Sequence, residues 1–127
     1  MIALFLSLAS VFQTPASTER PTEDSYYRVE PVPAPEGIAL EVSGIALLED
    51  SRPLVCTRRG EVFVVDNAYG ETGKKPVFHL FAQGLQEPLG LPPHDGFIYC
   101  LQRGELSRMR DVDGDLQMDE LETVCDD

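Results

Sequence analysis

The side chains best suited to chemistry lie in one acidic stretch near the end of the printed sequence. Aspartates occupy every second position of residues 111–115, and further acidic residues follow at positions 119 and 122. A calcium ion takes about six to eight oxygen ligands, and alternating aspartates on a tight loop direct several oxygens toward one point. We therefore predict a structural calcium site formed by Asp111, Asp113, Asp115, Gln117, Asp119 and Glu122, with Gln117 contributing its backbone carbonyl.

The spacing of these residues resembles the calcium loop of EF-hands, dockerins and thrombospondin-type repeats. Counted from Asp111, the predicted ligands fall at positions one, three, five, seven, nine and twelve. The sequence departs from that pattern at position six, where the glycine that forms the turn is replaced by Leu116. Gly114 can supply the bend instead, because glycine adopts positive φ without steric cost. The alternative interpretation is a solvated acidic turn without an ion.

No other residues show the spacing of a catalytic or metal-binding motif. His79 and His94 are single histidines without a partner at metal-ligand spacing, and no phosphate-binding glycine loop occurs. Arg58, Arg59 and Arg103 are expected at turns, where arginines pair with acidic neighbours on the surface or face a ligand channel. We assign no catalytic residue.

Charge excludes two classes of partner. The chain has 127 residues and a formal net charge of −12. A field of this sign repels phosphate backbones and anionic lipid surfaces, so neither nucleic acid nor an anionic membrane surface is an expected partner.

The start of the chain has the composition of an export signal. Residues 1–12 are nearly all apolar and small residues follow, which predicts a signal peptide over residues 1–17 and an exported protein, periplasmic or extracellular. No basic residue precedes Arg20, so a mis-assigned start is the alternative. Residues 18–37 form a proline-rich lead-in, and no later apolar run is long enough to span a membrane.

Beyond Gly37 the sequence predicts short strands. Eight apolar runs of four or five residues are bounded by Gly, Pro, Asp or Asn, as in antiparallel sheets. They cover residues 38–42, 45–48, 54–57, 62–65, 77–81, 97–101, 106–109 and 121–125. The predicted fold class is all-β, and the predicted calcium loop lies between the last two runs.

An internal repeat organises these strands. Residues 55–62 align without a gap on residues 99–106, an offset of 44 residues, and both copies contain Cys and Arg-Gly-Glu. Upstream, Gly44-Ile45 matches Gly90-Leu91. A period of about 44 residues with four short strands is typical of β-propeller blades. We predict an incomplete propeller over residues 38–127, with blade 1 at about 44–85 and blade 2 at about 88–127, and two uncovered apolar faces. A small sandwich or barrel is the alternative.

The repeat also bears on the three cysteines. The gap-free alignment puts Cys56 and Cys100 at equivalent points of neighbouring blades, and Cys125 two strands from Cys100, about 9–10 Å away. A disulfide needs Cα atoms within about 7 Å. We therefore predict three buried thiols and no bridge.

These segments resemble exported bacterial propellers of the soluble quinoprotein glucose/sorbosone dehydrogenase superfamily, including those labelled membrane-bound dehydrogenase domains. The resemblance rests on residues 35–37, 55–62, 84–91 and 102–106 and on the acidic loop at 111–122. It implies a ring of about six blades, of which this chain is the N-terminal part. It also implies that the complete propeller binds pyrroloquinoline quinone and a sugar substrate, and that some members carry a cytochrome c domain. The other interpretation is a non-catalytic, calcium-stabilised propeller that binds glycans or protein partners at the cell envelope. Pro92 and Pro93 depart from the pattern, because proline removes ladder donors from an innermost strand.

Overall fold

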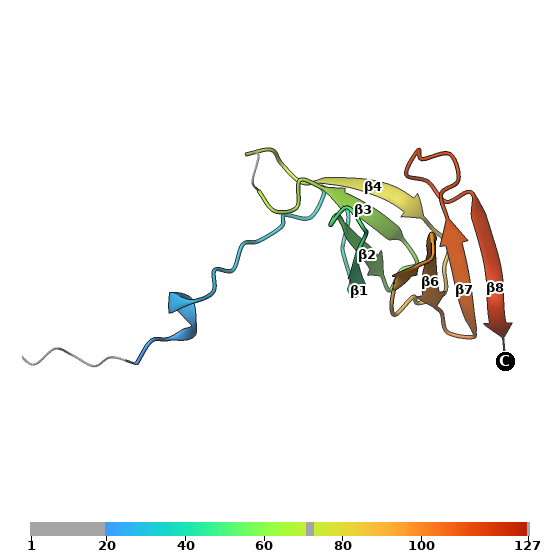
Figure 1. The fold of residues 1–127 in the computed structure, drawn as a ribbon, viewed down its shortest axis with the longest axis horizontal. Helices are drawn as coiled ribbons and strands as arrows, with labels where there is room; N and C mark the ends of the chain where they lie inside the picture. The colour runs from blue at the N-terminus through green and yellow to red at the C-terminus, as the bar shows by residue number, and fades with distance from the viewer. Residues whose placement is uncertain (1–19, 71–72, 127) are drawn as a thin grey trace, which may run out of the picture.

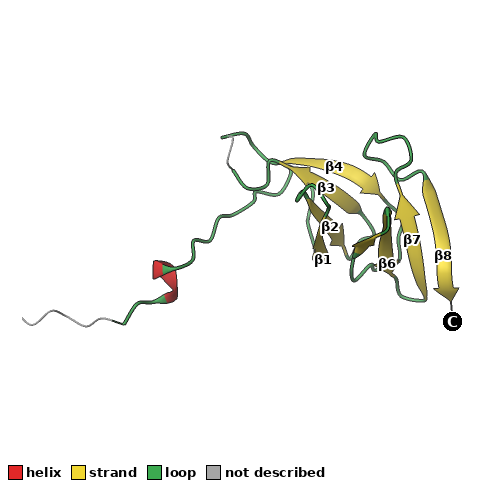
Figure 2. Cartoon of the chain, viewed as in Figure 1, coloured by secondary structure: helices red, strands yellow, loops and turns green. Residues whose placement is uncertain are grey.

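The computed structural model describes residues 20–70 and 73–126. Two four-stranded antiparallel sheets make up the body of the protein (Figure 1). Consecutive strands pair in both, in the order β1 to β4 in sheet A and β5 to β8 in sheet B. Among the described residues, the only helical element is a short 3-10 turn, η1 (Glu23–Ser25; Figure 2). The prediction of an all-β fold is confirmed.

The strands follow the predicted runs with two exceptions, the run at residues 38–42 and the strand β5, which lies outside every predicted run. Sheet A consists of β1 (Val42–Leu47), β2 (Pro53–Thr57), β3 (Val62–Asp66) and β4 (Val77–Ala82), and sheet B of β5 (Pro93–His94), β6 (Phe97–Leu101), β7 (Glu105–Arg110) and β8 (Glu120–Asp126). The separate strand predicted at residues 38–42 is wrong. Only Val42 is paired, as the first residue of β1, and the carbonyl of Glu41 accepts a hydrogen bond from the N–H of Arg58 instead.

The innermost strand of sheet B is short because of its prolines. Pro92 and Pro93 have no N–H, so the segment before β5 is held along β6 by few backbone hydrogen bonds. The N–H of Leu89 donates to the carbonyl of Leu101 at 3.0 Å, and the N–H of Tyr99 donates to the carbonyl of Pro92 at 3.0 Å. The chain therefore follows the path of a first strand, while only two residues are assigned to β5.

An extended arm precedes the sheets. From residue 20 the chain runs toward β1 without joining a strand, as Figure 1 shows. Tyr26 and Tyr27 on this arm are 69% and 75% exposed and cover neither sheet. The predicted signal peptide at residues 1–17 lies outside the described residues.

The two Arg-Gly-Glu corners join corresponding strands, β2 to β3 and β6 to β7, as the repeat predicts. In the first corner the N–H of Thr57 donates to the carbonyl of Glu61, and in the second the N–H of Gln102 donates to the carbonyl of Glu105. The first turn therefore contains three residues and the second contains two. Gly60 closes the longer turn at φ +96°, where a Cβ would collide with the backbone of Leu85.

This one-residue difference changes which residues correspond upstream of the corner. Cys56 pairs with Val62 next to the first corner, and Leu101 pairs with Leu106 next to the second. Leu101 is therefore the counterpart of Cys56, and Cys100 is the counterpart of Val55. The predicted equivalence of Cys56 and Cys100 is wrong, because a shift of one residue turns a strand side chain to the opposite face.

The two sheets stack through unlike faces around one hydrophobic core. We call the face of sheet A that carries the Cys56 side chain its front. The front of sheet B is the face that carries the counterpart of Cys56, Leu101, and the opposite face of each sheet is its back. The front of sheet A packs on the back of sheet B, where Cys100 lies. The buried residues that form this core are Leu54, Cys56, Val62, Val64, Phe81, Ala82, Leu85, Leu91, Ile98, Cys100 and Met109. The two sheets are therefore stacked head to tail, with the front of one on the back of the other.

The cysteines differ in environment. Cys56 and Cys100 are 0% exposed and lie in the same core, and both thiols are free. Burial raises the pKa of both, and that of Cys100 reaches about 12. The prediction that Cys125 is buried is wrong, because β8 is an edge strand and the Cys125 side chain is exposed and free.

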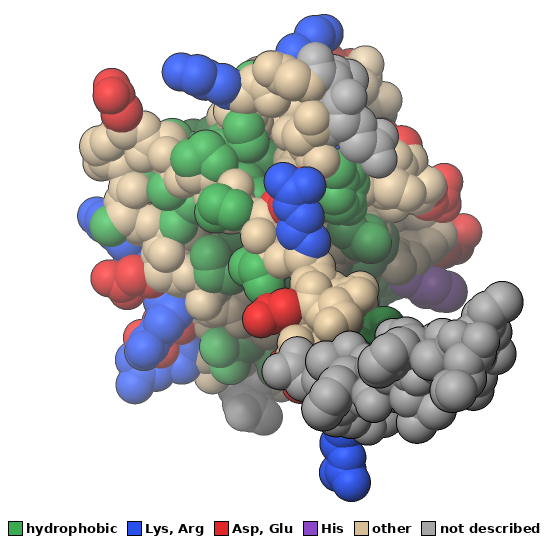
Figure 3. All heavy atoms as spheres, turned by 90° about the vertical axis from the view of Figure 1, so that its left-hand side faces the viewer, with side chains coloured by type: hydrophobic (Ala, Val, Ile, Leu, Met, Phe, Trp, Pro, Cys, Tyr) green, Lys and Arg blue, Asp and Glu red, His purple; other side chains and the backbone are tan. Residues whose placement is uncertain are grey.

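The two outer faces of the stack also differ. On the back of sheet A, an apolar row crosses all four strands through Ile45, Val55, Phe63 and Leu80. Figure 3 shows hydrophobic side chains gathered on this side of the molecule. On the front of sheet B, Arg108 lies opposite Tyr99, so one of the two predicted apolar faces carries charged side chains.

Candidate metal site and neighbouring cleft

The acidic loop connects β7 to β8, the third and fourth strands of sheet B, as predicted. One carboxylate oxygen from each of Asp111, Asp113 and Asp115 lies within 4.8 Å of the others. Two oxygens bound to one calcium ion at about 2.3–2.6 Å each lie no more than about 5 Å apart. The first three predicted ligands therefore have the spacing that a single calcium ion requires.

Hydrogen bonds to the backbone shape this loop. Asp111 accepts from the N–H groups of Gly114 and Leu116, at 2.7 and 2.8 Å. Asp113 accepts from the N–H of Asp115 at 3.2 Å. Gly114 and Leu116 both have positive φ, +83° and +67°. The bend predicted at Gly114 is present, and Leu116 adds a second one at the position where EF-hand loops have glycine.

The remaining predicted ligands take three different places. Gln117 donates its backbone N–H and its side-chain amide to Asp115, at 2.8 and 2.9 Å. Asp119 accepts from the N–H of Val112 at 2.7 Å and so closes the base of the loop. Glu122 lies on β8, where its carboxylate contacts the guanidinium of Arg108 at 2.6 Å. The carboxylates of Asp111, Asp113 and Asp115 thus lie together in the loop, whereas Glu122 lies in sheet B and pairs with Arg108.

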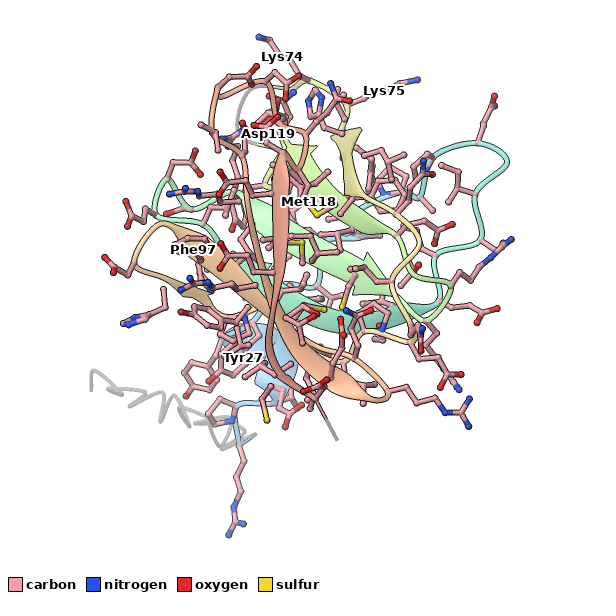
Figure 4. All side chains as sticks on the ribbon, turned by 90° about the vertical axis from the view of Figure 1, so that its right-hand side faces the viewer. Tyr27, Lys74, Lys75, Phe97, Met118 and Asp119 are labelled. Carbon is pink, nitrogen blue, oxygen red and sulfur yellow. The ribbon has the colours of Figure 1, made fainter. Side chains whose placement is uncertain are left out.

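One apolar residue, Met118, anchors the loop across the gap between the sheets. The N–H of Met118 donates to the carbonyl of Phe81 on β4 at 2.8 Å, and the Met118 side chain packs against the core. Figure 4 shows Met118 beside Asp119, at the end of the loop that enters β8. The position of Met118 in an otherwise acidic segment was the sequence signal for this contact. The conformation of the loop therefore depends on the contact between sheets A and B.

A cation and aromatic cluster lies on the front of sheet B, and the sequence analysis missed it. The guanidinium carbons of Arg108 and Arg110 lie 4.3 and 4.8 Å from the ring centre of Phe97, which Figure 4 labels. Arg108 pairs with Glu122 and Arg110 pairs with Glu120. The hydrogen bond that Arg108 donates to the Glu122 carboxylate is the main cause that raises the pKa of Arg108. The alternating Arg-x-Arg and Glu-x-Glu of β7 and β8 were the available signal, because facing strands bring such residues together.

A polar network occupies the corresponding end of sheet A. Arg52 contacts Asp50 at 2.7 Å and Asp66 at 3.3 Å, and His79 Nε2 lies 2.9 Å from Asp66. The hydrogen bond from the backbone N–H of Arg52 is the main cause that lowers the pKa of Asp50. His79 is thus part of a hydrogen-bond network with Asp66. The predicted surface pairing is present for Arg58, which lies 3.8 Å from Glu87.

A cleft of about 480 Å³ opens between the sheets beside the acidic loop. Its apolar floor includes Val64 and Phe81, and Arg52 and Arg110 lie on its rim with Asp111. Pockets for small ligands combine an apolar lining with a few polar groups in this way. The cleft is therefore a candidate binding site next to the candidate metal site.

Known proteins give no further guide to either site. Within the part of the chain that the structure describes, no helix has the length and apolar composition needed to cross a membrane. Comparison with protein families, with curated proteins and with solved structures found no match to this chain.

Proposed function

We propose that this chain supplies two neighbouring blades of an exported β-propeller and that calcium bound by the acidic loop stabilises them. The observation that carries this proposal is the head-to-tail stacking of two sheets with the same strand order and the same kind of corner. Contacts between unlike faces can be repeated, and propellers repeat four-stranded sheets around an axis. Two sheets are fewer than the four to eight blades, roughly, that a ring needs.

The sequence resemblance supports a ring of the quinoprotein glucose/sorbosone dehydrogenase type. In that case the complete protein binds pyrroloquinoline quinone, which supplies the redox chemistry, and oxidises a sugar. The groups that hold the cofactor then belong to the other blades. No residue of this sequence matches a base or a cofactor-holding residue of that superfamily, so we assign this chain a structural part in the ring and no catalytic residue.

The cleft supports a second candidate function, a non-catalytic propeller that binds glycans or protein partners at the cell envelope. Its rim offers donors from Arg52 and Arg110 and acceptors from Asp50, above an apolar floor. Sugars present hydroxyl groups and apolar C–H faces, which such a lining accommodates. Binding of an aldose without oxidation, by the chain and by the complete protein, would favour this function over the dehydrogenase.

Calcium titration tests the metal part of the proposal. We expect the melting temperature to rise with calcium concentration, since a ligand at about 100 times its Kd stabilises the folded state by about 2.7 kcal/mol. The double variant Asp113→Asn with Asp115→Asn should lose this rise, because it removes two of the three clustered carboxylates. Glu122→Gln is the matched control and should keep it, because Glu122 binds Arg108. An unchanged melting temperature at millimolar calcium would reject the site.

The dehydrogenase part is tested separately. With added quinone, calcium and a redox dye, we expect no aldose oxidation by the 127-residue chain, because it holds no complete set of cofactor ligands. Turnover by this chain would show that the catalytic groups lie within it.

Further units of the same period in the reading frame beyond codon 127 would support a longer propeller, and their absence would count against it.

A further inference from the structure

The cleft between the sheets receives an acidic residue from the same turn of each sheet. Glu49 lies in the turn that joins β1 to β2, and Asp95 lies in the turn that joins β5 to β6. Both residues line the cleft. These two turns correspond to each other, since each joins the first strand of its sheet to the second.

The arginines of the cleft already have acidic partners. The guanidinium of Arg52 lies 2.7 Å from the carboxylate of Asp50 and 3.3 Å from that of Asp66. The guanidinium of Arg110 lies 2.8 Å from the carboxylate of Glu120. The positive charges of the cleft are therefore offset within the protein, while other N–H groups of both arginines can still donate to a ligand hydroxyl.

The carboxylates of Glu49 and Asp95 leave the cleft with an excess of negative charge. Both residues are exposed, and among the described residues no ion pair involves either of them. Asp111 also lines the cleft, but it belongs to the candidate metal site, where a bound ion would offset its charge. Together with the net charge of −12 on the whole chain, the two carboxylates attract cations to the cleft and repel anions.

The interior of the cleft suits a sugar ring. Its floor includes the buried side chains of Val64, Phe81 and Ile98, on which the C–H face of a sugar can pack. His94 also lines the cleft, and a histidine ring can exchange hydrogen bonds with hydroxyl groups. The volume of about 480 Å³ lies within the range of about 300–1,000 Å³ that is typical of pockets for small ligands.

We propose that the cleft binds an amino sugar, whose protonated amine pairs with Glu49 or Asp95 while its ring lies on the apolar floor. This inference rests on the second proposed function, glycan binding, and names the class of glycan. The amine donates charge-assisted hydrogen bonds to a carboxylate, which are stronger than those of a neutral hydroxyl. A neutral sugar lacks this charge, and an acidic sugar is repelled by the same carboxylates.

Three related sugars test the charge selectivity: glucosamine, glucose and glucuronate. Each is titrated into the 127-residue chain by calorimetry at pH 7 in calcium-free buffer. We expect the dissociation constant to increase from glucosamine to glucose to glucuronate. Glucosamine should bind roughly two- to fivefold more tightly than glucose, as for a partly exposed ion pair. Added salt should reduce this difference, because it screens the charges.

A double variant locates the selectivity in the cleft. Glu49→Gln with Asp95→Asn should bind glucosamine no more tightly than glucose. Asparagine tolerates the positive φ of +50° at position 95, so the turn is retained. The matched control is Glu23→Gln with Asp24→Asn on the arm, which removes the same charge and should keep the preference. Loss of the preference in both double variants would contradict the inference, because the net charge of the chain would then be its cause.

Other outcomes separate this inference from the proposed function. Equal binding of glucosamine and glucose would overturn the inference and leave glycan binding by the cleft standing. Tighter binding of glucuronate would also overturn it, because Arg52 and Arg110 would then bind the carboxylate of the ligand. If none of the three sugars bound, the inference and the second proposed function would both be rejected. The propeller arrangement is tested independently, by calcium titration and by the reading frame.

Discussion

Gly44 and Gly90 lie against each other where the innermost segments of the two sheets meet. A Cβ built on Gly44 would lie 3.1 Å from the Cα of Gly90 and 3.0 Å from the sulfur of Cys56. Ser43, next to Gly44, donates a hydrogen bond to the carbonyl of Pro88. Matched glycines of the two repeats therefore allow the backbones of neighbouring units to approach closely.

Gly44→Ala should destabilise the protein, because its added methyl group meets backbone atoms that cannot move independently of β5 and β6. Overpacking of this kind costs about 1–3 kcal/mol. Gly90→Ala is the matched control, since a Cβ there meets nothing within 4 Å, and it should change stability by less than about 0.5 kcal/mol. Urea unfolding of both variants measures the difference. Equal stabilities would show that the close approach of the two segments is wrong.

Glu105 should matter more than other acidic residues on the surface. Its carboxylate accepts hydrogen bonds from the side chains of Gln102 and Ser107, which are 7% and 0% exposed. Glu105→Ala leaves these buried donors short of a partner, at a cost of about 1–3 kcal/mol. Glu49→Ala, on the exposed turn after β1, is the control and should be nearly neutral. Thermal unfolding should separate the two variants, and the same melting temperature for both would contradict the hydrogen-bond network.

The strands and their pairing were predictable because each apolar run is bounded by turn residues. Seven of the eight strands and their order follow from runs such as residues 62–65 and from the Arg-Gly-Glu corners, whereas β5 lies outside the predicted runs. The correspondence of the cysteines was not predictable in this way. Gly60 lies in a three-residue turn and Gly104 in a two-residue turn. A sequence alignment alone does not show which turn contains the extra residue.

The candidate site was predictable in part for a similar reason. Alternating aspartates bring their carboxylates together within a short loop, so the clustering of Asp111, Asp113 and Asp115 follows from local spacing. The place of Glu122 depends on the strand register, which sets it opposite Arg108. Register across a sheet is fixed by packing and loop length rather than by spacing along one segment.

Thiol reactivity should distinguish Cys125 from the other two cysteines. A thiol reacts as the thiolate, so burial and a raised pKa protect Cys56 and Cys100. In the folded protein near neutral pH, a disulfide reagent such as Ellman's should titrate one thiol rapidly, and three in denaturant. Cys125→Ser should remove the rapid phase. Rapid reaction of all three thiols in the folded state would show that the core between the sheets is open.

Stability should fall at alkaline pH because of Cys100. Its folded pKa of about 12 lies above the reference value of 9.0, so above pH 9 the unfolded state loses the thiol proton first. The stabilisation is complete below pH 9 and is lost as the pH rises toward 12, by up to about 1.4 kcal/mol per pH unit. The raised pKa of Cys56 acts in the same direction.

Cys100→Val isolates this contribution, because Val55 occupies the corresponding position of sheet A. Urea titrations at each pH measure the free energy of unfolding. Between pH 8 and pH 10.5 this free energy should fall by about 2 kcal/mol less in the variant than in the unmodified chain. Cys125→Ser should retain the full dependence, since Cys125 is exposed in the folded protein. Lysine and tyrosine titrate alike in all three proteins, so the difference between them reports the buried thiol. If Cys100→Val and the unmodified chain lost stability equally, the Cys100 thiol would have to ionise as readily in the folded protein as in the unfolded chain. Solvent would then have to reach Cys100 between the two sheets.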